Sequence, residues 1–172
     1  MYPGAVVDLG LEAVALPDGR TLELEVVRHP GGAAAAAVDA AGRVCLLRQY
    51  RHAGGGWLWE LPAGKLDPGE DPLLTAQREL QEEAGLRAAC WTPLGSILTT
   101  PGFCDERIHL YLARELEAVP ATPGEHELLE VHWVELAKAL EWARGNRIED
   151  AKTLVALFRA AALLSGPRED ER

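Results

Sequence analysis

The sequence has few cysteines, and they are poorly placed for disulfides or for a metal. Cys45, Cys90 and Cys104 are the only three, and no two of them form a CxxC pair. An odd, widely spaced set of thiols does not suit a disulfide framework or a zinc site. It is typical of a reducing compartment, and we expect Cys104 to be an unreactive thiol.

Long apolar runs and clusters of basic residues are also missing. No stretch reaches the roughly 18 apolar residues of a membrane-spanning helix, and residues 1–5 lack the basic-then-apolar order of a secretory signal. The formal net charge is -10, with 27 acidic and 17 basic residues, which is unlike a protein that binds DNA or RNA. We therefore expect a cytoplasmic protein whose partners include no membrane and no nucleic-acid polymer.

What the sequence does have is enough apolar material for one core. It contains 172 residues, of which 48% are hydrophobic, and this predicts a single domain over residues 1–172. Residues 21–26 alternate with the period of a strand, and the strands predicted at 33–38 and 44–47 flank a turn, which predicts a hairpin. Residues 166–172 are polar and are expected to fray.

The rest of the chain alternates between strand and helix patterns. Strands are predicted at 57–61, 91–98, 108–113 and 128–134, and helices at 72–84, 135–143 and 151–164. This order predicts the α/β class, with a mixed β-sheet and helices packed on it.

The main chemical signal is a glutamate-rich helix between residues 64 and 86, GKLDPGEDPLLTAQRELQEEAGL. Glu79 and Glu83 share one helical face through their i,i+4 spacing, and Glu82 lies beside them. Hard divalent cations relieve the repulsion among such carboxylates, and oxygen-only ligands favour magnesium, manganese or calcium over zinc. A solvated acidic face is the alternative, and the glutamates alone do not decide between the two.

The residues around these glutamates add a longer pattern. Gly64 is followed after five residues by Glu70 and, after seven more, by residues 78–86, RELQEEAGL. This matches every fixed position of the Nudix box, GX5EX7REUXEEXGU, where U is aliphatic. The chain therefore resembles the Nudix hydrolases, whose fold is an α/β/α sandwich in which the box forms a loop, a helix and a loop. The resemblance implies metal-dependent hydrolysis of a nucleoside diphosphate linked to another moiety.

The resemblance also implies roles for the box residues. Glu79 and Glu83 are the implied metal ligands for Mg²⁺, with Mn²⁺ as a possible substitute, and Glu82 is an additional ligand or base. Arg78 is implied to orient the glutamates, and Glu70 to pair with Arg78. Bound metal ions neutralise charge on the pyrophosphate and lower the pKa of a water molecule, so that water is the nucleophile.

Segments outside the box are similar to the ADP-ribose pyrophosphatase branch of the family. They are residues 48–51, RQYR, residues 59–64, WELPAG, and residues 100–106, TPGFCDE. This similarity implies that ADP-ribose is hydrolysed to AMP and ribose 5-phosphate.

The same similarity implies further site residues. Arg51 is expected to contact a phosphate, the Ala63 carbonyl to join the metal shell, and Glu60 to bind or orient the substrate. An acidic loop late in the chain supplies a catalytic base or another ligand in this branch. Here that loop contains Glu125, the candidate base, and Glu127, the second candidate and a possible metal ligand.

Two expectations concern the same loop and the N-terminus. His126, between the two loop glutamates, is expected to be an exposed bystander. The branch forms homodimers in which N-terminal strands, here within residues 1–30, help to complete the partner's site. Arg28 is accordingly expected to reach substrate across the interface.

Other functions stay open at this point. A GDP- or UDP-linked sugar would use the same metal site with a different base pocket, and the sequence does not separate these substrates. Dinucleoside polyphosphates or damaged nucleoside triphosphates are a third possibility, which the downstream loop pattern disfavours. A non-catalytic, nucleotide-sensing Nudix domain is the alternative from another class, and the complete set of box acids opposes it.

Overall fold

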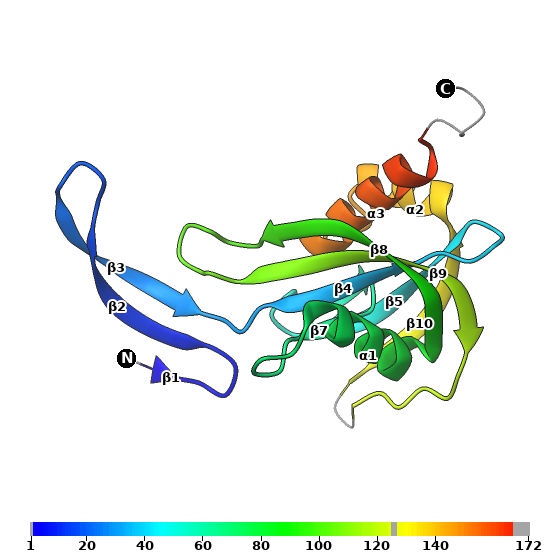
Figure 1. Cartoon of the computed structure of the whole chain (residues 1–172), viewed down its shortest axis with the longest axis horizontal. Helices are drawn as coiled ribbons and strands as arrows, with labels where there is room; N and C mark the ends of the chain where they lie inside the picture. Colours follow the sequence, from blue (N-terminus) through cyan, green and yellow to red (C-terminus); the bar gives the residue numbers. More distant parts are fainter. Residues whose placement is uncertain (1, 125–126, 167–172) are drawn as a thin grey trace.

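The computed structural model describes residues 2–124 and 127–166. Its elements follow in the order β1 (Tyr2–Pro3), β2 (Asp8–Ala15), β3 (Thr21–Arg28), β4 (Gly32–Ala37), β5 (Arg43–Arg51), β6 (Gly56–Glu60), β7 (Ala63–Lys65), α1 (Pro72–Ala84), β8 (Leu86–Leu98), β9 (Arg107–Ala118), β10 (Leu129–Glu135), α2 (Leu136–Arg144) and α3 (Ala151–Leu164) (Figure 1). Of the tail expected to fray, residues 166–172, only Gly166 lies within the described residues.

The strands form three sheets. A mixed sheet has the order β7-β4-β9-β8, in which β4 runs parallel to β9 and antiparallel to β7. A second sheet, β10-β5-β6, and a third, β1-β2-β3, are antiparallel. The third sheet extends away from the body of the molecule (Figure 1).

Strand β4 lies at the centre of the sandwich and is buried along its whole length. Ala34 and Ala36 pack into a core with α2 and α3, whereas Ala35 and Ala37 pack into a second core with α1. Successive side chains of a strand point to opposite faces, so this run of alanines lets helices pack closely on both. The α/β/α sandwich predicted from the sequence is confirmed.

Helix α1 has the bounds that the sequence predicts. It begins after Asp71, whose carboxylate accepts a hydrogen bond from the Leu73 N–H at 2.8 Å, and Pro72 occupies its first position. It ends at Gly85, which adopts a left-handed conformation with φ 63° and donates its N–H to the Gln81 carbonyl. These local signals fix where the glutamates of the box lie along the helix.

The hairpin predicted from residues 33–38 and 44–47 is wrong. Strands β4 and β5 belong to different sheets. Val38, the residue after β4, forms an isolated antiparallel bridge with Val44 of β5. Strand β4 hydrogen-bonds to β7 and β9, and β5 to β6 and β10, so both edges of each strand are already occupied. The turn at residues 39–42 therefore carries the chain from one sheet to the other.

The N-terminal sheet exposes apolar side chains. Leu9, Leu11 and Leu24 are 41%, 67% and 40% exposed. The sheet meets the rest of the chain at Val27, whose N–H donates to the Phe103 carbonyl at 2.7 Å. In the described part of the chain, no helix combines the length and apolarity needed to cross a membrane.

Candidate active site

A cleft of about 560 Å³ lies between α1 and the start of α3, beside strands β4 and β7. Helix α1 contributes Glu79 and Glu83 to it, and β7 contributes Ala63 and Gly64. The cleft therefore gathers carboxylates from the box helix against the strand that carries the first residue of the box.

Strand β7 and helix α1 fit together through the carboxylates. The Ala63 N–H donates to Glu83 Oε2 at 2.9 Å. A Cβ added at Gly64 would lie 1.9 Å from Glu79 Oε1, so any larger residue would displace that carboxylate. The first glycine of the box is thus needed because a carboxylate lies against its backbone.

Arg78 connects the acidic residues of the box. Its guanidinium donates to Glu79 at 2.6 Å and to Glu70 at 3.1 Å, and it lies 3.5 Å from a Glu82 oxygen. The hydrogen bonds from Arg78, then from the Thr75 hydroxyl, lower the pKa of Glu70 to about 2. These contacts place Arg78 and Glu70 where the resemblance implies, with Arg78 holding Glu79 and Glu70 holding Arg78.

The two central carboxylates lie in an unfavourable environment for negative charge. Burial raises the pKa of Glu83 to about 8, with Glu79 and Glu127 adding to the effect and the Ala63 N–H opposing it. Burial also raises the pKa of Glu79, although Arg78 opposes this. A cation between these groups would stabilise their charged forms.

The carboxylate and backbone oxygens of this site suit a magnesium ion that is partly coordinated by water, rather than a metal enclosed by protein ligands alone. Among residues 2–124 and 127–166, no three His, Cys, Asp or Glu side chains are arranged to hold a metal ion by themselves. Magnesium usually takes one or two carboxylates and completes its shell with waters and substrate phosphates. Glu79, Glu83 and the backbone at Ala63 match that open arrangement.

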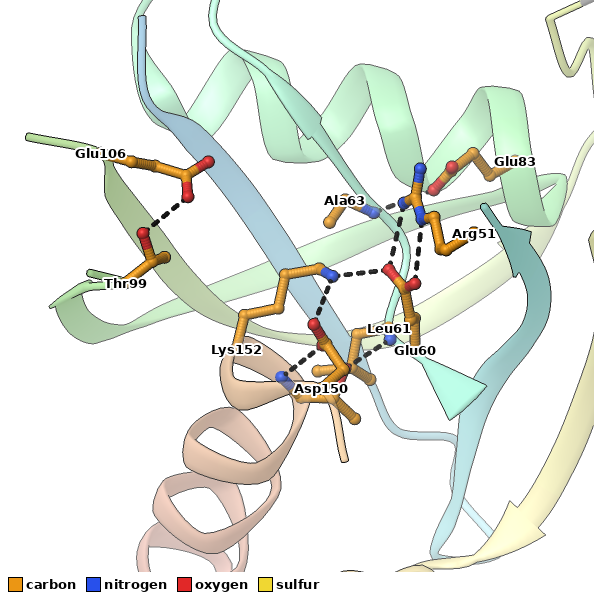
Figure 2. Close-up of polar contacts among 10 residues, drawn as sticks. Arg51, Glu60, Leu61, Ala63, Glu83, Thr99, Glu106, Asp150 and Lys152 are labelled. Carbon is orange, nitrogen blue, oxygen red and sulfur yellow. Dashed lines mark hydrogen bonds and ion pairs between the residues drawn. The ribbon is translucent and has the colours of Figure 1, made fainter. Parts of the chain in front are cut away.

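Two cations of the cleft share one carboxylate (Figure 2). Arg51 Nε and Nη2 donate to Glu60 at 2.9 and 3.0 Å, and Lys152 Nζ donates to Glu60 at 2.6 Å and to Asp150 at 2.9 Å. Arg51, Asp150 and Lys152 line the cleft. Glu60 is only 2% exposed and contacts both cations, and its role in binding or orienting substrate stays a prediction.

A third group of cleft residues was not predicted from the sequence. The Thr99 hydroxyl donates to Glu106 at 2.7 Å, and His29 Nδ1 lies 3.3 Å from the same carboxylate while accepting a bond from the Gly31 N–H. Glu106 lies within the predicted segment 100–106, which was the one available signal. Lys152 and Asp150 had no comparable signal, because only the fold brings Lys152 to Glu60, 92 residues away.

Several predicted residues lie at the margin of the cleft or outside it. Glu127 lines the cleft and accepts the Gly124 N–H at 2.8 Å. Glu82, with its side chain 40% exposed, does not line it. Arg28 does not line it either, and binds Glu12 and Asp105 of its own chain. The predicted base Glu125, like His126, lies outside the described residues, and the role of Arg28 in a partner's site stays a prediction.

The cleft brings buried carboxylates together with an arginine and a lysine, a combination that suits a phosphorylated ligand. Comparison with known proteins agrees, because the model of the NUDIX domain family matches residues 28–157. The chain belongs to the Nudix family.

Relatives and a solved structure extend this result. The chain is 40% identical to the ADP-ribose pyrophosphatase of Bacillus subtilis (strain 168), over 91% of this chain and 86% of that protein. It is also 40% identical to the methanol dehydrogenase activator of Bacillus methanolicus, with the same coverage. A crystal structure of an ADP compounds hydrolase matches with a TM-score of 0.82 over 96% of this chain and 90% of that one; at 22% identity this is a likeness of fold.

Proposed function

We propose that the protein hydrolyses the diphosphate of ADP-ribose to AMP and ribose 5-phosphate, using Mg²⁺ or, as a substitute, Mn²⁺. The observation that carries the proposal is the pair of buried carboxylates, Glu79 and Glu83, facing a cleft that also contains Arg51 and Lys152. A relative that is 40% identical and named ADP-ribose pyrophosphatase supports the choice of substrate.

Glu79, Glu83 and the Ala63 carbonyl would hold the magnesium, and Glu127 is close enough to add to the field around it. When bound, the metal offsets charge on the diphosphate oxygens and lowers the pKa of a water molecule. Arg78 keeps the Glu79 carboxylate oriented through the 2.6 Å hydrogen bond, and Glu70 fixes Arg78 from its other side.

The remaining residues bind substrate or handle protons. The Arg51 guanidinium binds a phosphate, for which its planar donors are suited. Glu125 is the candidate general base, Glu127 is the second candidate, and Glu82, which lies 3.5 Å from Arg78, is an additional ligand or base. Comparing the pH dependence of kcat in Glu125→Gln and Glu82→Gln tests the assignment, because only loss of the base removes the acidic limb of the profile.

A homodimer is part of the proposal. Leu9 and Leu11, exposed on the same face of β2, form an apolar surface that a second copy would cover. Arg28 would then reach the partner's substrate after leaving Glu12 and Asp105. Sedimentation that shows a monomer at the concentration of the assay removes Arg28 from the site.

A substrate panel tests the proposed reaction. ADP-ribose, GDP-mannose, UDP-glucose, diadenosine polyphosphates and nucleoside triphosphates are compared with magnesium present, and each product is identified. We expect ADP-ribose to lead by tenfold or more in kcat/KM, which is about 1.4 kcal/mol of transition-state binding. A lead for another substrate would keep the chemistry and change the substrate, and no turnover at all would favour a nucleotide-sensing domain.

A further inference from the structure

The ammonium group of Lys152 is held just beneath the surface of the cleft. Its side chain is 11% exposed, and Nζ donates to Glu60 at 2.6 Å and to Asp150 at 2.9 Å (Figure 2). An ammonium carries three N–H donors, so these bonds leave one. Within the described residues, no side chain or carbonyl accepts that third hydrogen.

The position of Lys152 is fixed by its surroundings. The Asp150 carboxylate accepts the Thr153 N–H at 3.0 Å and so caps the start of α3, and the Thr153 hydroxyl accepts the Leu61 N–H at 2.9 Å. These bonds tie the first turn of α3 to the strand end that carries Glu60. Lys152 is therefore presented to the cleft by a rigid support.

The charge of Lys152 is maintained although the side chain is buried. Burial alone would lower its pKa, but Asp150 and Glu60 raise the pKa above the ordinary value for lysine. A buried ion pair contributes little to stability compared with apolar side chains of the same volume. A buried, charged lysine that lines a cleft is thus better explained by a ligand than by packing.

Arg51 shares the carboxylate of Glu60 and completes the group. Its Nε and Nη2 donate to Glu60, and among the described residues nothing accepts a bond from its Nη1. Both cations line the cleft, and Figure 2 shows Lys152 at the start of α3 and Arg51 beside Glu83. Each cation retains a free donor, and one buried carboxylate sets the distance between them.

We propose that Lys152 and Arg51 form a cationic clamp for the diphosphate of the substrate, and that Glu60 is the positioning residue that holds both. The clamp binds phosphate oxygens in the part of the cleft between Lys152, at the start of α3, and Arg51, which lies beside Glu83. This inference rests on the proposed function because a diphosphate is the ligand that needs cations on both sides. Its direct test, however, requires only diphosphate binding and no turnover.

The chain suits a direct test because it contains three lysines, Lys65, Lys138 and Lys152. Protein labelled with ¹³C at lysine Cε gives one signal for each, and the signal missing from Lys152→Arg identifies Lys152. On titration with magnesium pyrophosphate we expect the Lys152 signal to move to saturation, and the signal of Lys138, exposed on α2, to stay in place. Magnesium chloride alone is the control for effects of the metal.

Two outcomes of this titration are decisive. A Lys152 signal that is unchanged at the highest pyrophosphate concentration overturns the clamp, whether or not the signal of Lys65, which also lines the cleft, moves. In Glu60→Gln the response of Lys152 should be smaller than in the wild type, because the carboxylate that positions it is gone. An undiminished response there removes the positioning role of Glu60.

Kinetics with ADP-ribose give the second test. Lys152→Gln should lower kcat/KM about 10- to 100-fold, the usual effect of losing a charge-assisted hydrogen bond. Lys152→Arg should recover part of that loss, and Lys138→Gln should behave as the wild type. If Lys152→Gln does not fold, the titration and the arginine variant still decide the question.

The two proposals fail in different ways. If the wild type binds pyrophosphate through Lys152 but does not hydrolyse ADP-ribose, the substrate is wrong and the clamp stands. If the wild type and a folded Lys152→Gln hydrolyse ADP-ribose equally well, the clamp is wrong and the proposed function stands.

Discussion

Replacing Glu83 by glutamine should stabilise the metal-free protein at alkaline pH while abolishing its function. The substitution preserves the shape of the side chain and an oxygen for the Ala63 N–H, which donates to Glu83 at 2.9 Å. It removes a negative charge from a position that is 2% exposed and close to Glu79. The negative charge of Glu83 binds the metal when one is present and destabilises the folded protein when none is bound.

The size of the effect follows from the pKa of Glu83. Its pKa is raised from 4.5 to about 8 in the folded protein, so between these pH values the folded state binds a proton that the unfolded state has released. Stability is therefore full below about pH 4.5 and falls as the pH rises to about 8. At about 1.4 kcal/mol per pKa unit the loss is at most about 5 kcal/mol.

Glu83→Gln does not regain all of the stability that the wild type loses as the pH rises. Its buried amide brings new N–H donors, and leaving these unpaired costs about 1–3 kcal/mol. We expect Glu83→Gln to be less stable than the wild type at pH 5 and more stable by about 1–3 kcal/mol at pH 9, with the two stabilities crossing between those values.

Urea unfolding with a chelator present, followed by circular dichroism at pH 5, 7 and 9, measures this crossing. Glu82→Gln is the matched control, since that side chain is 40% exposed and should show no crossing. Added magnesium should stabilise the wild type by mass action and the Glu83 variant far less. If Glu83→Gln is the less stable protein throughout, Glu83 is already compensated without metal and the electrostatic reasoning about the site is wrong.

Three further results are expected. Gly64→Ala should weaken magnesium binding and lower kcat, because its Cβ would displace the Glu79 carboxylate that now lies 1.9 Å from that position, and titration of activity with magnesium checks this. Arg78→Lys should lower kcat/KM about tenfold or more, because a single ammonium does not reproduce the planar fork whose separate nitrogens donate to Glu79 and to Glu70; activity equal to the wild type would show that neither contact orients the site. Removal of divalent metal with a chelator should stop turnover, and excess magnesium should restore it; turnover that persists in the chelator would place the chemistry elsewhere.

Local signals explain what could be predicted from the sequence. The bounds of α1 were predicted because proline at its first position and Gly85 at its end act within one turn of the chain. The contacts of Arg78 with Glu70 and Glu79 lie within the same short segment. The spacing of residues within this short segment was therefore enough to predict the part of the site that the Nudix box contains.

Contacts between segments that are far apart in the sequence explain what could not be predicted. Residues 33–38 and 44–47 look like a hairpin, yet β4 pairs with β9 and β5 pairs with β10, far along the chain. The contact of Glu60 with Lys152 could not be predicted, because it depends on where α3 begins to pack, 92 residues along the chain. Nothing local to residues 150–152 marks them as part of a site.

The proposed reaction is hydrolysis of ADP-ribose in the cleft between α1 and α3, with the help of metal held by Glu79 and Glu83. Its most direct test is the rate of AMP and ribose 5-phosphate formation from ADP-ribose by the wild type and by Glu83→Gln, each with magnesium. We expect equal amounts of both products from the wild type and a rate at least about 100-fold lower from the folded variant. No product from the wild type, or comparable rates from the two proteins, would contradict the proposal.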